Sequence, residues 1–233
     1  MNRNLFIFIL PFILTIVTFQ QTQGQQNDFQ FWPSVQLNLE VIKDLKLHVE
    51  EELRLHENIS QFSRQISDIG VSYRLNKHVK AAVFYRIEAD WKNADEYAWR
   101  NGIYGDVTFK YEPKRFSLGY RLRIQSSKVE MNEKQVYMLN GFRHRHKISA
   151  EYNIKGIPLS PFIEGELLIG NSSGKGSEIL GYRSRIGVNY SLGKAHNIYI
   201  KYGIDQELNT PDPLRAYIIA LGYSLNLRLK SIK

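Results

Sequence analysis

The sequence predicts an all-β protein: an up-and-down antiparallel transmembrane β-barrel of 10–12 strands, with short periplasmic turns and longer external loops. Three observations predict it. Apolar and polar residues alternate along eleven segments, and a period of two indicates strands. No segment has the period of a long amphipathic helix. Tight polar turns also alternate with longer polar links, as in barrels whose two ends differ.

The first half of the chain supplies six of these segments. Residues 79–91, VKAAVFYRIEADW, show the pattern clearly, because one row is apolar from Val79 to Trp91 and the other is mostly charged. Tight turns are expected at Lys43-Asp44, Asn76-Lys77 and Pro113-Lys114. The six segments are VQLNLEV (35–41), LKLHVEEELRL (45–55), IGVSYRL (69–75), VKAAVFYRIEADW (79–91), IYGDVTFKY (103–111) and FSLGYRLRI (116–124).

The second half supplies five more, with tight turns expected at 155–158 and at Gly193-Lys194. The longer polar links of the whole chain lie at 56–61, 92–97, 126–141, 171–178 and 207–213. The five segments are ISAEYNI (148–154), IEGELLI (163–169), IGVNYSL (186–192), IYIKYGI (198–204) and YIIALGYSLNLRL (217–229).

An odd number of strands conflicts with the even number of bacterial single-chain barrels. If the short turns are periplasmic, the first strand starts outside. Either residues 27–33 (DFQFWPS, with Pro33 as a break) add another element, or one segment is two strands or none.

The first 24 residues are expected to be a cleavable signal peptide, and residues 25–233 the outer-membrane barrel domain. Arg3 precedes an apolar run over residues 5–19, and polar residues follow up to Gly24. The run has the length of a signal-peptide core and is short for a spanning helix. An uncleaved anchor helix is the alternative.

Composition narrows the class of function. The chain has a net charge of +8 and no cysteine, which excludes disulfides, thiolate chemistry and a lipoprotein anchor. A positive net charge often indicates nucleic-acid binding. Here the basic residues are spread singly and the expected signal peptide exports the chain, so we expect no nucleic-acid partner.

Strand length favours apolar rows that face lipid. The strands expected around these segments, of about 10 to 14 residues, exceed the usual 5 or 6 of globular proteins, whereas a tilted strand needs about 9–11 residues to cross the hydrocarbon layer. The polar rows would then face the lumen. The alternative is a secreted soluble β-barrel or sandwich with its apolar faces inward.

The polar rows mix small residues with long charged ones, which suits a narrow lumen. We expect Arg–Glu pairs there that close the pore. The alternative is a selective path for an anion or a polar solute. The predicted network comprises Arg121, Arg123, Arg143, Arg145, Arg183, Arg185, Glu50, Glu52, Glu88, Glu164 and Glu166.

The outer wall is expected to meet the lipid interface through aromatic residues and a histidine pair. His144 and His146 share a face with Ile148, while Trp91 and Tyr217 lie near segment ends, as in aromatic girdles. The histidines have no third group for a catalytic triad or a metal site at a matching spacing. The segment Gly174-Lys175-Gly176-Ser177 lacks the full phosphate-loop spacing.

Four stretches resemble a family of Bacteroidetes outer-membrane proteins known as domain of unknown function family 2490: DFQFW, KDLKLHVEEELRL, GVSYRLN and FRHRHKISAEY. The resemblance covers most of the chain after residue 24. It implies a membrane barrel and supplies no catalytic or binding residue. The final residues 229–233 lack the terminal aromatic residue of many such barrels.

We therefore expect a Gram-negative outer-membrane barrel that is not an enzyme and needs no cofactor or metal. Its role is solute passage, surface binding or envelope integrity. The expected partners are membrane lipids, lipopolysaccharide included, and the barrel assembly machinery; a small-molecule ligand stays unspecified. The alternatives are a lipid-modifying hydrolase in the membrane and a soluble periplasmic β-barrel binding protein.

Overall fold

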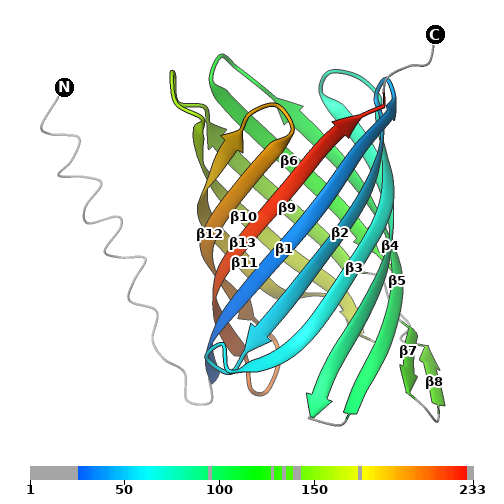
Figure 1. Ribbon diagram of the computed structural model, residues 1–233. Helices are drawn as coiled ribbons and strands as arrows, with labels where there is room; N and C mark the ends of the chain where they lie inside the picture. Colours follow the sequence, from blue (N-terminus) through cyan, green and yellow to red (C-terminus); the bar gives the residue numbers. More distant parts are fainter. Residues whose placement is uncertain are drawn as a thin grey trace, which may run out of the picture.

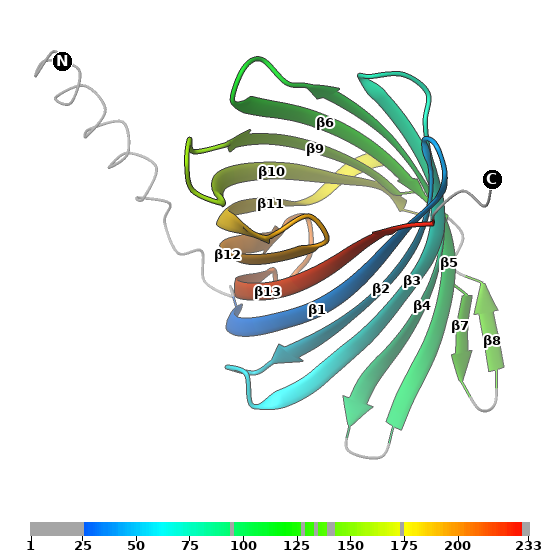
Figure 2. The same cartoon turned by 45° about the horizontal axis from the view of Figure 1, so that its top comes forward.

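The computed structural model describes residues 26–93, 96–126, 129–132, 135–138, 143–172 and 175–229. The predicted signal peptide, residues 1–24, lies outside these ranges. The described part is all-β, and no helix in it is long and apolar enough to cross a membrane. Eleven long strands form a closed ring, with a small hairpin outside it (Figures 1 and 2). The predicted fold class is confirmed.

The barrel strands follow one another around the wall in chain order. The hairpin of β7 (Val129–Asn132) and β8 (Gln135–Met138) extends from β5. The barrel strands are β1 (Gln26–Ile42), β2 (Leu45–His56), β3 (Gln61–Arg74), β4 (Val79–Asn93), β5 (Glu96–Tyr111), β6 (Phe116–Gln125), β9 (Arg143–Tyr152), β10 (Leu159–Ser172), β11 (Lys175–Leu192), β12 (His196–Glu207) and β13 (Leu214–Arg228).

The odd strand number is resolved by a parallel seam. In an up-and-down meander of eleven strands the first and last run in the same direction, so closure requires a parallel pair. β1 and β13 form it, from Gln26 opposite Leu214 to Glu40 opposite Arg228. They lie side by side in Figure 1. Residues 27–33 are therefore part of β1 and not another element, and Pro33 does not break the strand.

The two ends of the barrel differ. At one end the connections are 43–44, 75–78, 112–115, 153–158 and 193–195, and the positive φ of Asp44 (68°) and Gly193 (82°) permits tight turns. We call this the short-turn end. At the other end the strands run further than the sequence indicated. Much of the predicted links 92–97 and 171–178 belongs to strands, because β4 with β5 and β10 with β11 continue to pair there.

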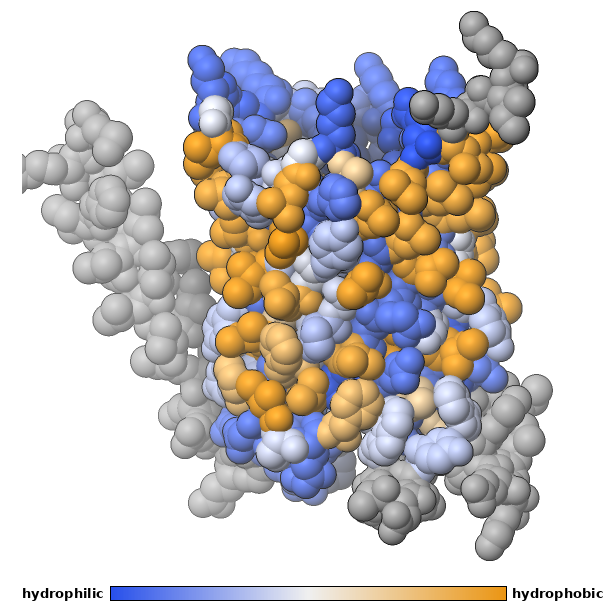
Figure 3. Space-filling view, in the orientation of Figure 1, coloured by the Kyte–Doolittle hydropathy of each residue, from blue (hydrophilic) through white to orange (hydrophobic). Residues whose placement is uncertain are grey.

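The apolar rows face outward on all eleven barrel strands. Val83, Ile148 and Ile186 expose 56%, 65% and 61% of their surface, respectively. Figure 3 shows apolar residues over much of the visible wall, with hydrophilic residues at the rim of the short-turn end and in patches between. The alternative with apolar faces inward is wrong for this chain. The arrangement is the one that a membrane barrel requires.

Small residues in the lumen make room for long ones. A Cβ at Gly222 would lie 2.1 Å from the Tyr199 ring, and one at Gly203 would lie 2.4 Å from Arg185 Cδ. Both distances are too short for real contacts. The large side chains therefore lie across the glycines of neighbouring strands, as expected for a filled lumen.

Candidate functional site: the charged lumen

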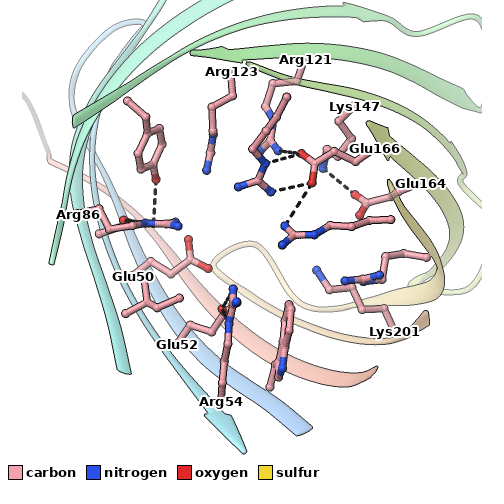
Figure 4. A pocket seen from close by; sticks show the side chains of 17 residues that line it. Glu50, Glu52, Arg54, Arg86, Arg121, Arg123, Lys147, Glu164, Glu166 and Lys201 are labelled. Atoms are coloured by element: carbon pink, nitrogen blue, oxygen red, sulfur yellow. Dashed lines mark hydrogen bonds and ion pairs between the residues drawn. The ribbon is translucent and has the colours of Figure 1, made fainter. Parts of the chain in front are cut away.

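The middle of the lumen contains a cavity of about 180 Å³ lined almost entirely by charged side chains. Nine of them are cationic and five are carboxylates. They come from strands all around the barrel and point toward its axis (Figure 4). The period of two places them there, because alternate residues of each strand share a face.

Glu166 on β10 is the hub of this network. Its carboxylate accepts hydrogen bonds from Arg121 Nη2 at 2.7 Å, from Arg145 Nη2 at 2.7 Å and from Arg183 Nη1 at 3.4 Å. The strands β6, β9 and β11 supply these arginines. Next to it, Lys147 Nζ donates to Glu164 at 2.8 Å. Four strands are thus tied together across the lumen.

Aspartates neutralise the cations on the β3–β6 side. Arg86 donates two hydrogen bonds to Asp68, at 2.7 and 2.5 Å, and Arg123 donates two to Asp106, at 2.7 and 2.8 Å. Such bidentate pairs fix both partners. The guanidinium of Arg123 also lies 3.8 Å from the centre of the Tyr104 ring, a favourable cation–π arrangement.

The β11–β12 side and the β1–β2 side complete the ring of charges. Asp205 on β12 accepts from both Arg183 and Arg185 on β11. On β2, Arg54 pairs with Glu52 and stacks 3.7 Å above the Trp32 ring of β1. Trp32 is therefore an aromatic wall of the central cavity.

A second charged cluster lies toward the end opposite the short turns. Asp90 pairs with Arg64 and, at 2.7 Å, with Arg100. Glu88 is almost fully buried and lies within 4 Å of Arg64 and Arg86. Each carboxylate of this cluster is thus paired with arginines.

A neutral layer and a second cavity lie on the other side of the central cavity. Asn38 Nδ2 donates to Asn226, and the His48 ring nitrogens lie 2.5 Å from Asn38 Oδ1 and 2.7 Å from Ser72 Oγ. Beyond this layer, near the short turns, is a cavity of about 330 Å³. Its cations are Lys43, Lys46, Arg74, Lys80 and Arg228, against Glu40 and Asp44.

The structure brings together most of the charges named from the sequence. Arg121, Arg145 and Arg183 meet Glu166, as described above, whereas Glu164 binds Lys147 and Glu52 binds its near neighbour Arg54. Glu88 belongs to the second cluster. Arg143, at the start of β9, is not among the residues lining the central cavity.

Sequence reasoning missed the aspartates. Asp68 forms an ion pair with Arg86, and Asp106 forms one with Arg123. Asp205 forms ion pairs with both Arg183 and Arg185. All three lie in the polar rows, so the period of two contained the signal, but pairing across strands needs the register. Lys147, which was not part of the predicted network, also points inward and donates to Glu164.

The structure places His144 and His146 on the outer wall, opposite Ile124 and Leu122 of β6. His146 Nδ1 lies 2.8 Å from the Tyr120 hydroxyl. Trp91 packs edge-on against Phe62, with ring centres 4.7 Å apart, and Tyr217 lies near the start of β13. Contact of these residues with lipid stays a prediction.

The described residues contain no group of three or more His, Cys, Asp or Glu side chains that can hold a metal ion. Ser149 opposes Gly119 and Glu164 across its neighbouring strands, on the polar row of β9 and away from the histidine face. Tyr120 is therefore the polar partner that the structure gives His146. The contact is a hydrogen bond between side chains of the neighbouring strands β6 and β9.

Together, the closed ring, the apolar wall and the ion-paired interior define a β-barrel of the inside-out kind. The chain belongs to the family described as "Protein of unknown function (DUF2490)", which matches residues 29–213. This confirms the resemblance seen in the sequence. No match is found among curated proteins.

Proposed function

We propose that the protein is an outer-membrane β-barrel with a closed lumen, acting as a non-catalytic scaffold that supports the envelope. The observation that carries the proposal is the direction of neighbouring residues on β4. Val83 and Tyr85 are exposed outside, whereas Arg86 and Glu88 are enclosed and ion-paired. A bilayer is the solvent that favours this inversion.

The extent of the apolar wall supports a membrane rather than water. A soluble monomer rarely exposes a contiguous apolar patch larger than a few hundred Å². Here large apolar side chains are exposed on every strand of the ring. The expected partners are therefore membrane lipids, including lipopolysaccharide, and the barrel assembly machinery during insertion.

The ion pairs support a closed lumen. The Glu166 hub joins β6, β9, β10 and β11, and His48 is hydrogen-bonded to its neighbours on β1 and β3 between the levels of the two cavities. For a barrel of this size, side chains fill most of the interior. Free diffusion of solutes would require these pairs to separate.

Fractionation and conductance test the proposal. The mature chain should be recovered in the outer-membrane fraction, migrate differently on gels before and after heating, and give no current steps in planar bilayers. Recovery in the soluble periplasmic fraction would contradict membrane insertion. Large, stable steps would contradict the closed lumen.

A second candidate function is selective passage of small anions. It is favoured by the excess of cations over carboxylates in both lumen cavities. Small anion-selective steps in the same bilayer experiment would support this function over the scaffold.

The absence of catalysis is part of the proposal and has its own test. Replacing His144 and His146 with Ala should leave the phospholipid and lipid A profile of the host membrane unchanged. A changed profile with normal protein levels would support a lipid-modifying activity.

A further inference from the structure

The central cavity contains more positive than negative charge even after every pair is counted. Nine cations line it. Five carboxylates line it as well, and Glu88, Asp106 and Asp205, which lie within ion-pair distance of lining arginines, bring the number to eight. The cations are concentrated on one side, because β6, β9, β11 and β12 supply seven of the nine.

Lys201 on β12 lines this cavity and forms no ion pair within the part of the chain that the structure describes. Among the described residues no carboxylate lies within ion-pair distance of its amine, which lies 4.8 Å from the centre of the Tyr199 ring. Figure 4 shows it reaching from the wall into the cavity. An ammonium group has three N–H donors, and those of Lys201 are available to a ligand in the cavity.

Glu50 on β2 is the corresponding free acceptor. It lines the same cavity and, within the described part of the chain, forms no hydrogen bond or ion pair. In the ring, β1 and β13 separate β2 from β12, and Figure 4 shows Glu50 and Lys201 on different sides of the cavity. One cavity therefore offers an unused donor on one wall and an unused acceptor on the other.

The cavity is large enough for a ligand. Its volume of about 180 Å³ compares with the roughly 10–15 Å³ that a single water needs. Arg145 and Arg183 also line the cavity, and guanidinium groups match the geometry of phosphate and carboxylate oxygens. A ligand that accepts from cations and also donates to a carboxylate would use all of these groups.

We propose that this cavity binds one small oxyanion that keeps a proton, of the hydrogen-phosphate type, between Lys201 and Glu50. Lys201 and the neighbouring arginines donate to its oxygens, and its hydroxyl donates to Glu50. The inference goes beyond the scaffold role, because binding needs entry from one side only and no passage through the barrel.

Trp32 gives a direct readout. The mature chain is refolded from urea into a non-ionic detergent, so that no lipid phosphate is present, with Trp91→Phe and Trp99→Phe leaving Trp32 as the fluorophore. Sodium phosphate is titrated at constant ionic strength against sodium chloride, and calorimetry checks the stoichiometry. We expect saturable binding at one site, at least about tenfold tighter than sulfate, which has no proton to donate to Glu50.

Two variants and one matched control separate a site from general attraction. Lys201→Gln should weaken phosphate binding at least about tenfold, and Glu50→Gln should reduce the preference for phosphate over sulfate. Lys80→Gln removes the same charge from the other cavity and should leave binding within about twofold, as expected for a distant charge. Heat-modifiable migration confirms that each variant is folded.

Three results would overturn the proposal. They are no saturable signal with folded protein, equal binding of phosphate and sulfate, and an equal loss in Lys201→Gln and Lys80→Gln. None of them bears on membrane insertion or conductance, so a failure here is distinguishable from a failure of the proposed scaffold function.

Discussion

At the scale of single residues, the stability of the lumen depends on carboxylates that several cations share. Glu166 is almost fully buried, and its single negative charge is shared by the guanidinium groups of Arg121, Arg145 and Arg183. A buried pair gains little over an apolar replacement, but removing one partner leaves a charge with no compensation. A single substitution at Glu166 is therefore expected to lower the stability of the barrel more than a substitution at an ordinary ion pair.

Glu166→Gln should destabilise the folded barrel by about 3–5 kcal/mol, because three guanidinium groups lose their shared charge. Urea unfolding followed on gels by heat-modifiable migration measures this. The control is Glu112→Gln, which breaks the exposed pair of Glu112 with Lys110 and should cost no more than about 1 kcal/mol. An equal loss of unfolding free energy in both variants would show that Glu166 contributes no more to stability than an exposed ion pair.

At the scale of elements, the parallel pair of β1 and β13 decides whether the ring closes. Neighbouring strands elsewhere are joined by a connection that limits their register, whereas β1 and β13 are far apart in the chain. Their register is held by backbone pairing and by the hydrogen bond between Asn38 and Asn226, and Ser34 of β1 also contacts Tyr199 of β12, the next strand beyond β13. A shift by one residue would turn the apolar row of β1 inward.

Engineered cysteines test this register in a chain that has none of its own. Leu37 and Leu225 are direct partners across the seam, so Leu37→Cys with Leu225→Cys should form a disulfide on mild oxidation. A mobility shift on non-reducing gels, reversed by a reducing agent, reports the bond. Leu37→Cys with Leu221→Cys places the sulfurs too far apart, and efficient cross-linking of that pair would contradict the register.

At the scale of the whole molecule, the barrel is a protein turned inside out with respect to its solvent. Its apolar side chains form the outer wall, and its buried core is made of ion pairs and hydrogen bonds. In water this arrangement would leave the apolar wall unburied and lose the main driving force of folding. In lipid, the closed ring also pairs each described barrel strand with a neighbour on both sides, so that the ring has no open sheet edge.

Ile186→Arg tests the surroundings of the wall. Ile186 lies on β11 and is 61% exposed. At the bilayer midplane the change should cost about 2–4 kcal/mol, whereas an exposed site in water changes stability by about 0.5 kcal/mol or less. Urea titration in lipid vesicles measures the difference. Ile157→Arg, in the turn 153–158, is the control and should cost at most about 1 kcal/mol.

Much of this architecture could be predicted from the sequence. The alternating rows located eleven strands and their outward and inward faces, since the period of two is a local property of the extended backbone. The inward direction of Arg121, Arg145 and Glu166 followed from the same rows. Strand ends were predicted less well, as with Asn93 and Glu96 at the tips of β4 and β5, because their extension depends on pairing with a neighbour.

What the sequence determined by itself is thus the all-β class, the position of eleven alternating segments and which residues share a face. Only the tertiary structure decided which residues of different strands contact one another. It shows the parallel pairing of β1 with β13 and Asp106, rather than a glutamate, beside Arg123. It also places Lys201 and Glu50 in the lining of one cavity. The physical reason is that alternation is written into each strand separately, whereas register and closure join strands distant in the chain.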